Sequence, residues 1–107
     1  MASHRTELLL PLDAPNARWA SVRGIAQGGW NVDRDEPGRI SLHESSERAR
    51  SPLRVDIEWD PASEAPTLVR LTGKAFGGPF QFRHMRGRVE ALRAGIEAAS
   101  LDMARLS

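Results

Sequence analysis

The longest hydrophobic pattern in this chain lies in its last third. Apolar residues recur there at steps of three and four, which places them on one face of a single long helix over residues 79–106. Pro79 suits the first position of that helix, where its missing N–H costs no hydrogen bond. The members of this apolar stripe are Met85, Val89, Leu92, Ile96, Ala99, Met103 and Leu106.

A shorter helix is predicted over residues 15–27. The segment Asp13-Ala14-Pro15-Asn16 is typical of a helix start, and Gly28-Gly29 is typical of a helix end. Helical spacing gives this helix one apolar face, which we expect to be buried. Its members are Trp19, Val22, Ile25 and Ala26.

The remaining apolar segments alternate with polar residues, which predicts strands with one buried face. These segments are residues 6–12, a hairpin over residues 30–44 that turns at Asp35-Glu36-Pro37-Gly38, residues 53–59 and residues 68–75. Residues 45–51 are predicted to form a loop, and residues 60–66 a turn. Gly73, inside the last strand, indicates either a bulge or a close approach of the long helix.

Together these elements predict a single α+β domain over residues 1–107. We expect a two-layer arrangement of order β-α-β-β-β-α, with an antiparallel sheet and the long C-terminal helix packed across one of its faces. The other face of the sheet should meet water. It carries Arg54, Asp56, Glu58, Arg70, Thr72 and Lys74.

Composition narrows the function classes. A net charge of +1 excludes a protein whose affinity for nucleic acid would follow from its charge alone. The absence of cysteine excludes disulfides and thiolate metal sites, and no carboxylates have EF-hand spacing, so we expect no metal and no other cofactor. No signal-type segment opens the chain and no apolar run approaches about 18 residues, so we expect a soluble, cytoplasmic protein with no membrane segment.

The element order and two short motifs of this chain resemble those of small helix-grip domains. These motifs are the Gly-Gly-Trp that closes the shorter helix, Gly28 to Trp30, and the Asp-Glu-Pro-Gly of the hairpin, Asp35 to Gly38. The chain is similar to a shortened relative of the START-like (SRPBCC) group, and also to short α+β domains of unknown function common in bacteria. In the START-like group the long helix and a curved sheet enclose an apolar ligand cavity. The resemblance therefore implies a ligand between sheet and helix.

Our leading functional prediction is a non-catalytic binding module that holds an apolar small molecule or a protein partner between the sheet and the long helix. Arg83 and Arg86 would position an acidic group of the ligand. Aromatic residues would line the pocket, although the same residues also fit a packed core without a ligand. These ligand-binding candidates are Trp19, Trp30, Trp59, Phe76 and Phe80.

An alternative is an anion-binding or nucleic-acid-backbone site at the start of the long helix. Gly77-Gly78-Pro79 leaves free N–H groups there, and such a helix end attracts anions. The same basic residues also fit a solvated helix face whose arginines pair with acids on the sheet. The anion-binding candidates are Lys74, Arg83, Arg86 and Arg88.

A third alternative is assembly through the long helix. A 28-residue helix spans about 42 Å and a seven-residue strand about 23 Å, so the helix end would overhang the sheet. The stripe from Ile96 to Leu106 would then be exposed and support a homodimer or a partner helix. The acidic segment over residues 30–64 would bind a basic partner, unless its acids are scattered over turns and the wet face.

The sequence does not predict an enzyme. His4, His43 and His84 fall in different elements, and no serine has a Gly-x-Ser-x-Gly context. His43 and Glu44 would form a general-base pair only opposite a nucleophile.

Overall fold

The structure is a computed structural model that describes residues 2–44 and 53–106. Over these residues it forms five strands and two helices: β1 (Ala2–Leu10), α1 (Ala14–Gln27), β2 (Trp30–Glu36), β3 (Arg39–Glu44), β4 (Arg54–Glu58), β5 (Thr67–Ala75) and α2 (Pro79–Leu106). The α+β class, the antiparallel sheet and the long C-terminal helix are confirmed. Four strands separate the helices; the predicted segments contain all four, whereas the order β-α-β-β-β-α counts only three. The loop predicted over residues 45–51 lies outside the described residues.

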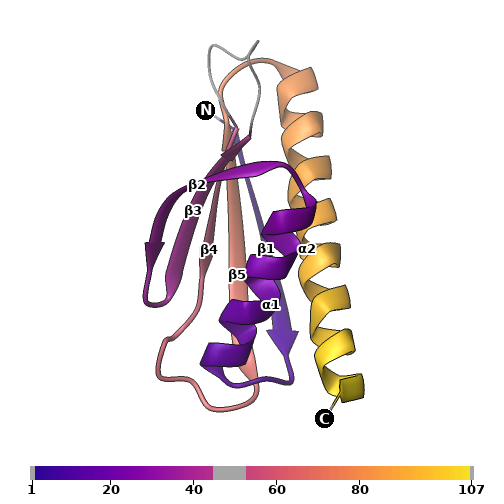
Figure 1. Cartoon of the computed structure of the whole chain (residues 1–107). Helices are drawn as coiled ribbons and strands as arrows, with labels where there is room; N and C mark the ends of the chain where they lie inside the picture. The colour runs from indigo at the N-terminus through magenta and orange to yellow at the C-terminus, as the bar shows by residue number, and fades with distance from the viewer. Residues whose placement is uncertain (1, 45–52, 107) are drawn as a thin grey trace.

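The five strands form one antiparallel sheet in the order β1-β5-β4-β3-β2. β1 pairs with β5 along its whole length, from Ala2 opposite Ala75 to Leu10 opposite Thr67. Helix α2 packs on β1 and β5, and α1 packs against α2. Figure 1 shows both helices on the same side of the sheet, with α1 beside the C-terminal half of α2. Neither helix, over the residues described, has the length and hydropathy needed to span a membrane.

Strict alternation along β4 and β5 builds the core. Val55 and Ile57 of β4 and Val69 and Leu71 of β5 point toward the helices and are buried. Their sequence neighbours lie on the opposite, wetter face, as the pattern over residues 53–59 and 68–75 predicts. We call the face toward the helices the inner face and the opposite face the outer face.

Gly73 marks a close approach between β5 and α2. A Cβ atom at this position would lie 2.5 Å from Cγ2 of Val89 and 2.7 Å from Sδ of Met85. The pairing of β5 with both neighbouring strands runs through Gly73 without a register shift. Of the two sequence interpretations, close approach is therefore correct and a bulge is not.

The buried face of α1 differs from the one predicted. Its start is as expected, because the Asp13 side chain accepts a hydrogen bond from the Asn16 backbone N–H at 3.2 Å. Trp19 and Val22 are exposed, however, and only Ile25 of the predicted apolar face is buried. Small residues occupy the contact with α2 because the two helices approach closely. The buried residues of α1 are Ala14, Ala17, Ala20, Ser21, Gly24 and Ile25.

The first part of the C-terminal stripe of α2 is covered rather than exposed. Ile96 and Ala99 are buried, and a Cβ atom added to Gly24 of α1 would lie 2.7 Å from Cγ1 of Ile96. The predicted exposure of the stripe is therefore wrong for these two residues, because α1 extends the helical layer beside them. Met103 is only partly buried, and the side chain of Leu106 lies outside what the structure describes.

Candidate functional site

The space between the sheet and the helices is filled by side chains. Ile40, Val55 and Ile57 on the inner face, and Met85 on α2, have exposed fractions of at most 1%. A cavity large enough for a water molecule would give its lining residues accessible surface. These residues therefore border no such cavity, and a ligand has no preformed space against them.

The five aromatic candidates do not share one pocket. Trp59 is a core residue, whereas Trp30 is partly buried beneath the guanidinium of Arg88, which lies 4.4 Å from its ring centroid. The other three are exposed. They are Trp19, at 39%, Phe76, at 55%, and Phe80, at 84%. The expectation that Trp19 faces inward is wrong for the same reason as the predicted face of α1.

The four predicted anion-binding residues are also separated. Arg88 is held by three groups: it donates to Glu44 at 3.3 Å and to the Gly28 carbonyl at 2.6 Å, and it stacks on Trp30. Glu44 also pairs with His84 at 2.8 Å. The start of α2 therefore pairs with an acid of the sheet, as in the interpretation of its basic residues that needs no ligand. Arg83 and Arg86 are exposed on α2. Lys74 lies on the other side of the sheet.

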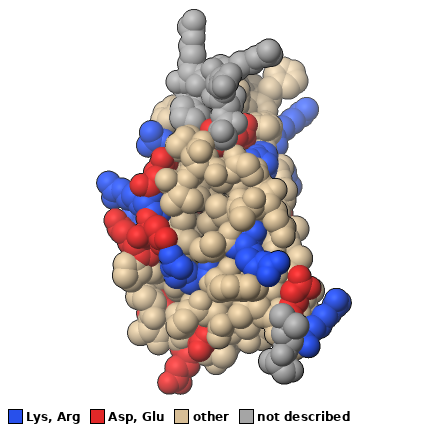
Figure 2. All heavy atoms as spheres, in the orientation of Figure 1, with Lys and Arg blue, Asp and Glu red and all other residues tan. Residues whose placement is uncertain are grey.

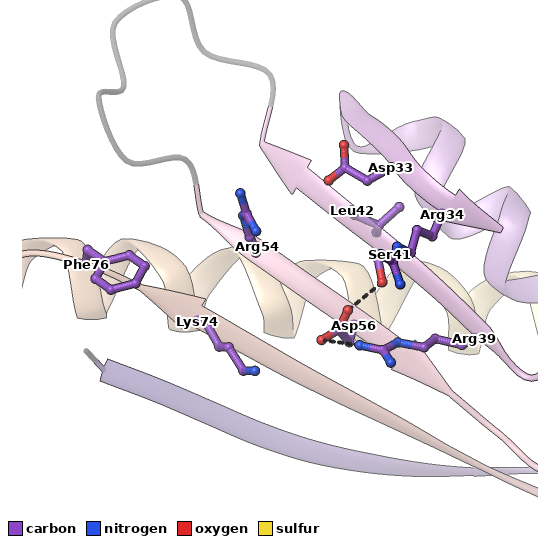
Figure 3. Close-up of a pocket in the computed structure, with 9 residues that line it drawn as sticks. All are labelled: Asp33, Arg34, Arg39, Ser41, Leu42, Arg54, Asp56, Lys74 and Phe76. Atoms are coloured by element: carbon purple, nitrogen blue, oxygen red, sulfur yellow. Dashed lines mark hydrogen bonds and ion pairs between the residues drawn. The ribbon is translucent and has the colours of Figure 1, made fainter. Parts of the chain in front are cut away.

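Lys74 belongs to a hollow on the outer face. Figure 3 shows most of its side chains on the side of the sheet opposite α2; they come from β2, β3, β4 and β5 and from Phe76, which directly follows β5. The hollow has a volume of about 450 Å³ and is more basic than acidic. It is lined by Asp33, Arg34, Arg39, Ser41, Leu42, Arg54, Asp56, Lys74 and Phe76.

One row of the outer face alternates in charge. Residues that are direct Cα partners across all five strands read negative, positive, negative, positive, negative, an arrangement that stabilises a sheet. We call this set the alternating row. In the order β1, β5, β4, β3, β2 it consists of Glu7, Arg70, Glu58, Arg39 and Glu36.

Another row of the same face carries basic residues on three adjacent strands. Lys74 of β5 is directly opposite Arg54 of β4, which is directly opposite His43 of β3. We call these three residues the basic row. Within the described part of the chain, no hydrogen bond or ion pair joins Lys74 or Arg54 to an acid. Like charges directly opposite each other destabilise a sheet, so this end of the face is left electrostatically unsatisfied.

The acids of the hollow are already engaged. Asp56 accepts a hydrogen bond from Oγ of Ser41 at 2.6 Å and pairs with Arg39 at 3.4 Å (Figure 3). Asp33 pairs with Nδ1 of His43 at 2.7 Å. Lys74 and Arg54 are therefore the cations that an added anion meets first. A guanidinium and an ammonium suit a carboxylate or a phosphate, and the exposed ring of Phe76 offers apolar surface beside them.

The acidic segment of the sequence does not form one surface. Asp35 pairs with Arg18 of α1, while Asp33, Glu44 and Asp56 pair with the partners given above. Acidic and basic side chains intermingle over the β2–β3 hairpin, along the left margin of Figure 2. Among the described residues, no group of three or more histidines and acids could hold a metal ion.

Sequence reasoning identified Lys74 but missed Arg54 as its neighbour. It placed both residues on the wet face, yet it grouped Lys74 with the arginines that follow it along the chain. The signal that could have found the pair is strand register, because Arg54 and Lys74 are 20 positions apart and meet only once β4 and β5 are aligned.

Comparison with known proteins identifies the fold. No protein-family model and no curated protein matches the chain. Among solved structures, a protein from Thermobifida fusca known by solution NMR has a TM-score of 0.64 and 16% identity, over 100% of this chain and 96% of that one. Ara h 8.0201 has a TM-score of 0.54 and 10% identity, over 94% of this chain and 98% of that one. These similarities confirm the resemblance to helix-grip domains at the level of the fold.

A third similar structure changes one prediction. The di-domain ARO/CYC BexL from the BE-7585A biosynthetic pathway has a TM-score of 0.54 and 16% identity, over 91% of this chain and 47% of that one. A domain of this fold therefore occurs in an aromatase/cyclase. The prediction that the chain is not an enzyme is accordingly withdrawn, since its fold is compatible with enzymatic activity.

Proposed function

We propose that this protein binds a small organic anion in the hollow on the outer face of its sheet. Arg54 and Lys74 hold the carboxylate or phosphate of the ligand, and Phe76 contacts its apolar part. The observation that carries the proposal is the direct pairing of Arg54 with Lys74, with no acid bonded to either among the described residues, on a face that also carries a row of alternating charge.

The energetic argument compares the two rows of one surface. In the alternating row each inner charge lies between two opposite charges, so that row needs no ligand. In the basic row, an anion between Arg54 and Lys74 replaces a repulsion by two attractions. Charge-assisted hydrogen bonds are the stronger class of hydrogen bond, and a bound carboxylate gains them from both side chains.

The outer face is preferred to the interior because of space. An apolar ligand between the sheet and α2 would have to displace side chains such as Val55 and Ile57, which are packed with almost no accessible surface. The hollow needs no such displacement. The helix-grip fold supports a ligand-handling role in general, and the basic row points to the charge of the ligand.

An NMR titration tests this proposal. Phenylacetate provides a carboxylate and an aromatic ring, and phenylacetamide is its neutral counterpart. We expect phenylacetate, and not phenylacetamide, to shift the backbone amide signals of residues near positions 54 and 74. Lys74→Gln and Arg54→Gln should each weaken binding about tenfold, the effect of losing one charge-assisted hydrogen bond.

Arg70→Gln is the matched control. It removes the same charge from the same strand and the same face, but from the alternating row. We expect binding to this variant to stay within about twofold of the wild type, as expected for a charge that does not contact the ligand. Equal binding of phenylacetamide, or an equal loss in the Arg70 variant, would contradict the proposal.

A further inference from the structure

His43 lies next to two residues that line the hollow, one of which is an acid bonded to its ring. Its Nδ1 is 2.7 Å from Oδ1 of Asp33, and its cross-strand partner is Arg54. Both neighbours line the hollow. An ionised carboxylate only accepts hydrogen bonds, so Nδ1 carries the proton and Nε2 of the neutral ring keeps its lone pair. No hydrogen bond to Nε2 is found in the part of the chain that the structure describes.

A bulge in β2 lies at this contact. Asn31 pairs with His43 and Val32 with Leu42, but Ser41 pairs with Arg34, so Asp33 is the extra residue of the strand. Regular pairing would place Asp33 on the same face as His43 but directly opposite Ser41, because side chains two residues apart in a strand share a face. A bulge redirects the side chain of the residue it inserts, and here Asp33 bonds to His43.

The other two histidines differ from His43 because an acid is bonded to their Nε2. Nε2 of His84 is bonded to Glu44, and Nε2 of His4 is bonded to Glu90 of α2. In both cases the nitrogen that would accept a proton from a ligand is occupied. Among the described residues, His43 is the histidine that combines an acid on one nitrogen, no hydrogen bond to the second nitrogen and a direct cross-strand cation, Arg54.

We propose that His43 is a catalytic general base that acts on the anion held by Arg54 and Lys74, and that Asp33 is its positioning residue. The substrate class is a small 2-oxo acid with an apolar end, and the reaction is its keto–enol interconversion. This inference rests on the proposed function, because the same two cations must first hold the carboxylate.

The proton step is balanced without any other reactant. Nε2 of His43 takes a proton from the carbon beside the carbonyl, and the electron pair of the broken C–H bond forms the C=C bond of the enolate. The electron pair of the carbonyl π bond moves to the oxygen, and Arg54 stabilises the resulting negative charge on that oxygen. Return of a proton from His43 to the oxygen gives the enol, and its return to carbon restores the 2-oxo acid.

Phenylpyruvate is the probe, because it combines a carboxylate, exchangeable C–H bonds beside a carbonyl and an aromatic ring. Its methylene protons exchange with deuterium in D₂O, and proton NMR follows the loss of their signal. We expect the protein to accelerate this exchange about 100-fold over buffer, at the lower end of general-base catalysis. His43→Gln should return the rate to that of buffer, while phenylpyruvate still binds.

Two further variants separate catalysis from structure. Asp33→Asn should lower kcat about tenfold with little change in KM, because it misdirects the base without removing a ligand contact. His4→Gln is the control, since it removes a histidine that pairs with Glu90 outside the hollow. It should exchange at the wild-type rate.

The outcomes distinguish the two proposals. If phenylpyruvate shifts no amide signal near positions 54 and 74, the proposed function fails and the catalytic inference fails with it. If phenylpyruvate binds but wild type and His43→Gln exchange at the same rate, only the catalytic inference is overturned. Exchange that is lost equally in His4→Gln would also overturn it.

Discussion

Arg54 and Lys74 are direct cross-strand partners, so two positive charges meet at one point of the outer face. On the same two strands, Glu58 and Arg70 are partners of opposite charge. The pairing rule that stabilises the sheet at one position is therefore broken at another. A broken local rule of this kind is expected where a surface is adapted to a ligand rather than to stability.

Reversing one charge of the basic pair should raise stability and abolish binding. In Lys74→Glu an acid faces Arg54, and a favourable cross-strand pair contributes about 0.2–1 kcal/mol. We expect urea denaturation to show a higher free energy of unfolding by this amount, and the phenylacetate titration to show no binding. Arg70→Glu is the control. It should destabilise the fold, because it places a third acid between Glu7 and Glu58.

Two helix glycines should respond to alanine in opposite directions. In Gly24→Ala the new Cβ would lie 2.7 Å from Cγ1 and 3.0 Å from the backbone nitrogen of Ile96, so α1 and α2 must separate. We expect a loss of about 1–3 kcal/mol in the free energy of unfolding. In Gly87→Ala nothing lies within 4 Å of the new Cβ, so the gain in helix propensity should stabilise the protein by about 0.5–1 kcal/mol. Equal effects of the two variants would mean that α1 and α2 are not in close contact.

The contact beneath Gly73 can be tested by compensation. Gly73→Ala should destabilise the protein by about 1–3 kcal/mol, because its Cβ meets Cγ2 of Val89 at 2.5 Å. Val89→Ala removes that methyl group and leaves a small cavity. In the double variant the two effects should partly cancel, which a double-mutant cycle of denaturation measurements detects as a favourable coupling energy. Strict additivity would contradict the packing of α2 on β5 at this position.

Arg88 should contribute much more to stability than its neighbour Arg86. Arg88→Ala removes the hydrogen bond to the Gly28 carbonyl, the ion pair with Glu44 and the stacking on Trp30. We expect the free energy of unfolding to fall by about 1–3 kcal/mol, against less than about 0.5 kcal/mol for Arg86→Ala at an exposed position. Arg88→Lys should recover only part of the loss, because an ammonium group lacks the planar fork.

The elements were predictable because each has a local signal, and the contacts between them were not. Alternation fixes which side of β4 holds Val55 and Ile57, whatever lies next to it. Hydrophobicity alone misjudged α1, because a close helix–helix contact selects small residues such as Gly24 over Trp19. The predicted exposure of Ile96 failed for a related reason, since one sequence does not tell which helix face meets another.

In the candidate site, too, the position of each residue was predictable and the contacts between residues were not. The sequence placed Arg54 and Lys74 on the wet face of the sheet, and the structure agrees. Their pairing depends on register between β4 and β5, and the contact of Asp33 with His43 depends on register between β2 and β3. Both are properties of neighbouring strands, so the charges were visible in the sequence while their meeting point was not.

The pairing of β1 with β5 also fixes the order in which the chain closes. During synthesis from the N-terminus, Leu8 and Leu10 emerge long before Val69 and Thr67, their partners on β5. These two leucines, buried in the finished protein, stay without their strand neighbour until about sixty further residues have been made. Contacts so distant in sequence close slowly, typically in about milliseconds to seconds for sheet-dominated domains. The β1–β5 pair therefore joins the strands of the sheet that are furthest apart in the sequence, and α2 packs on both of them.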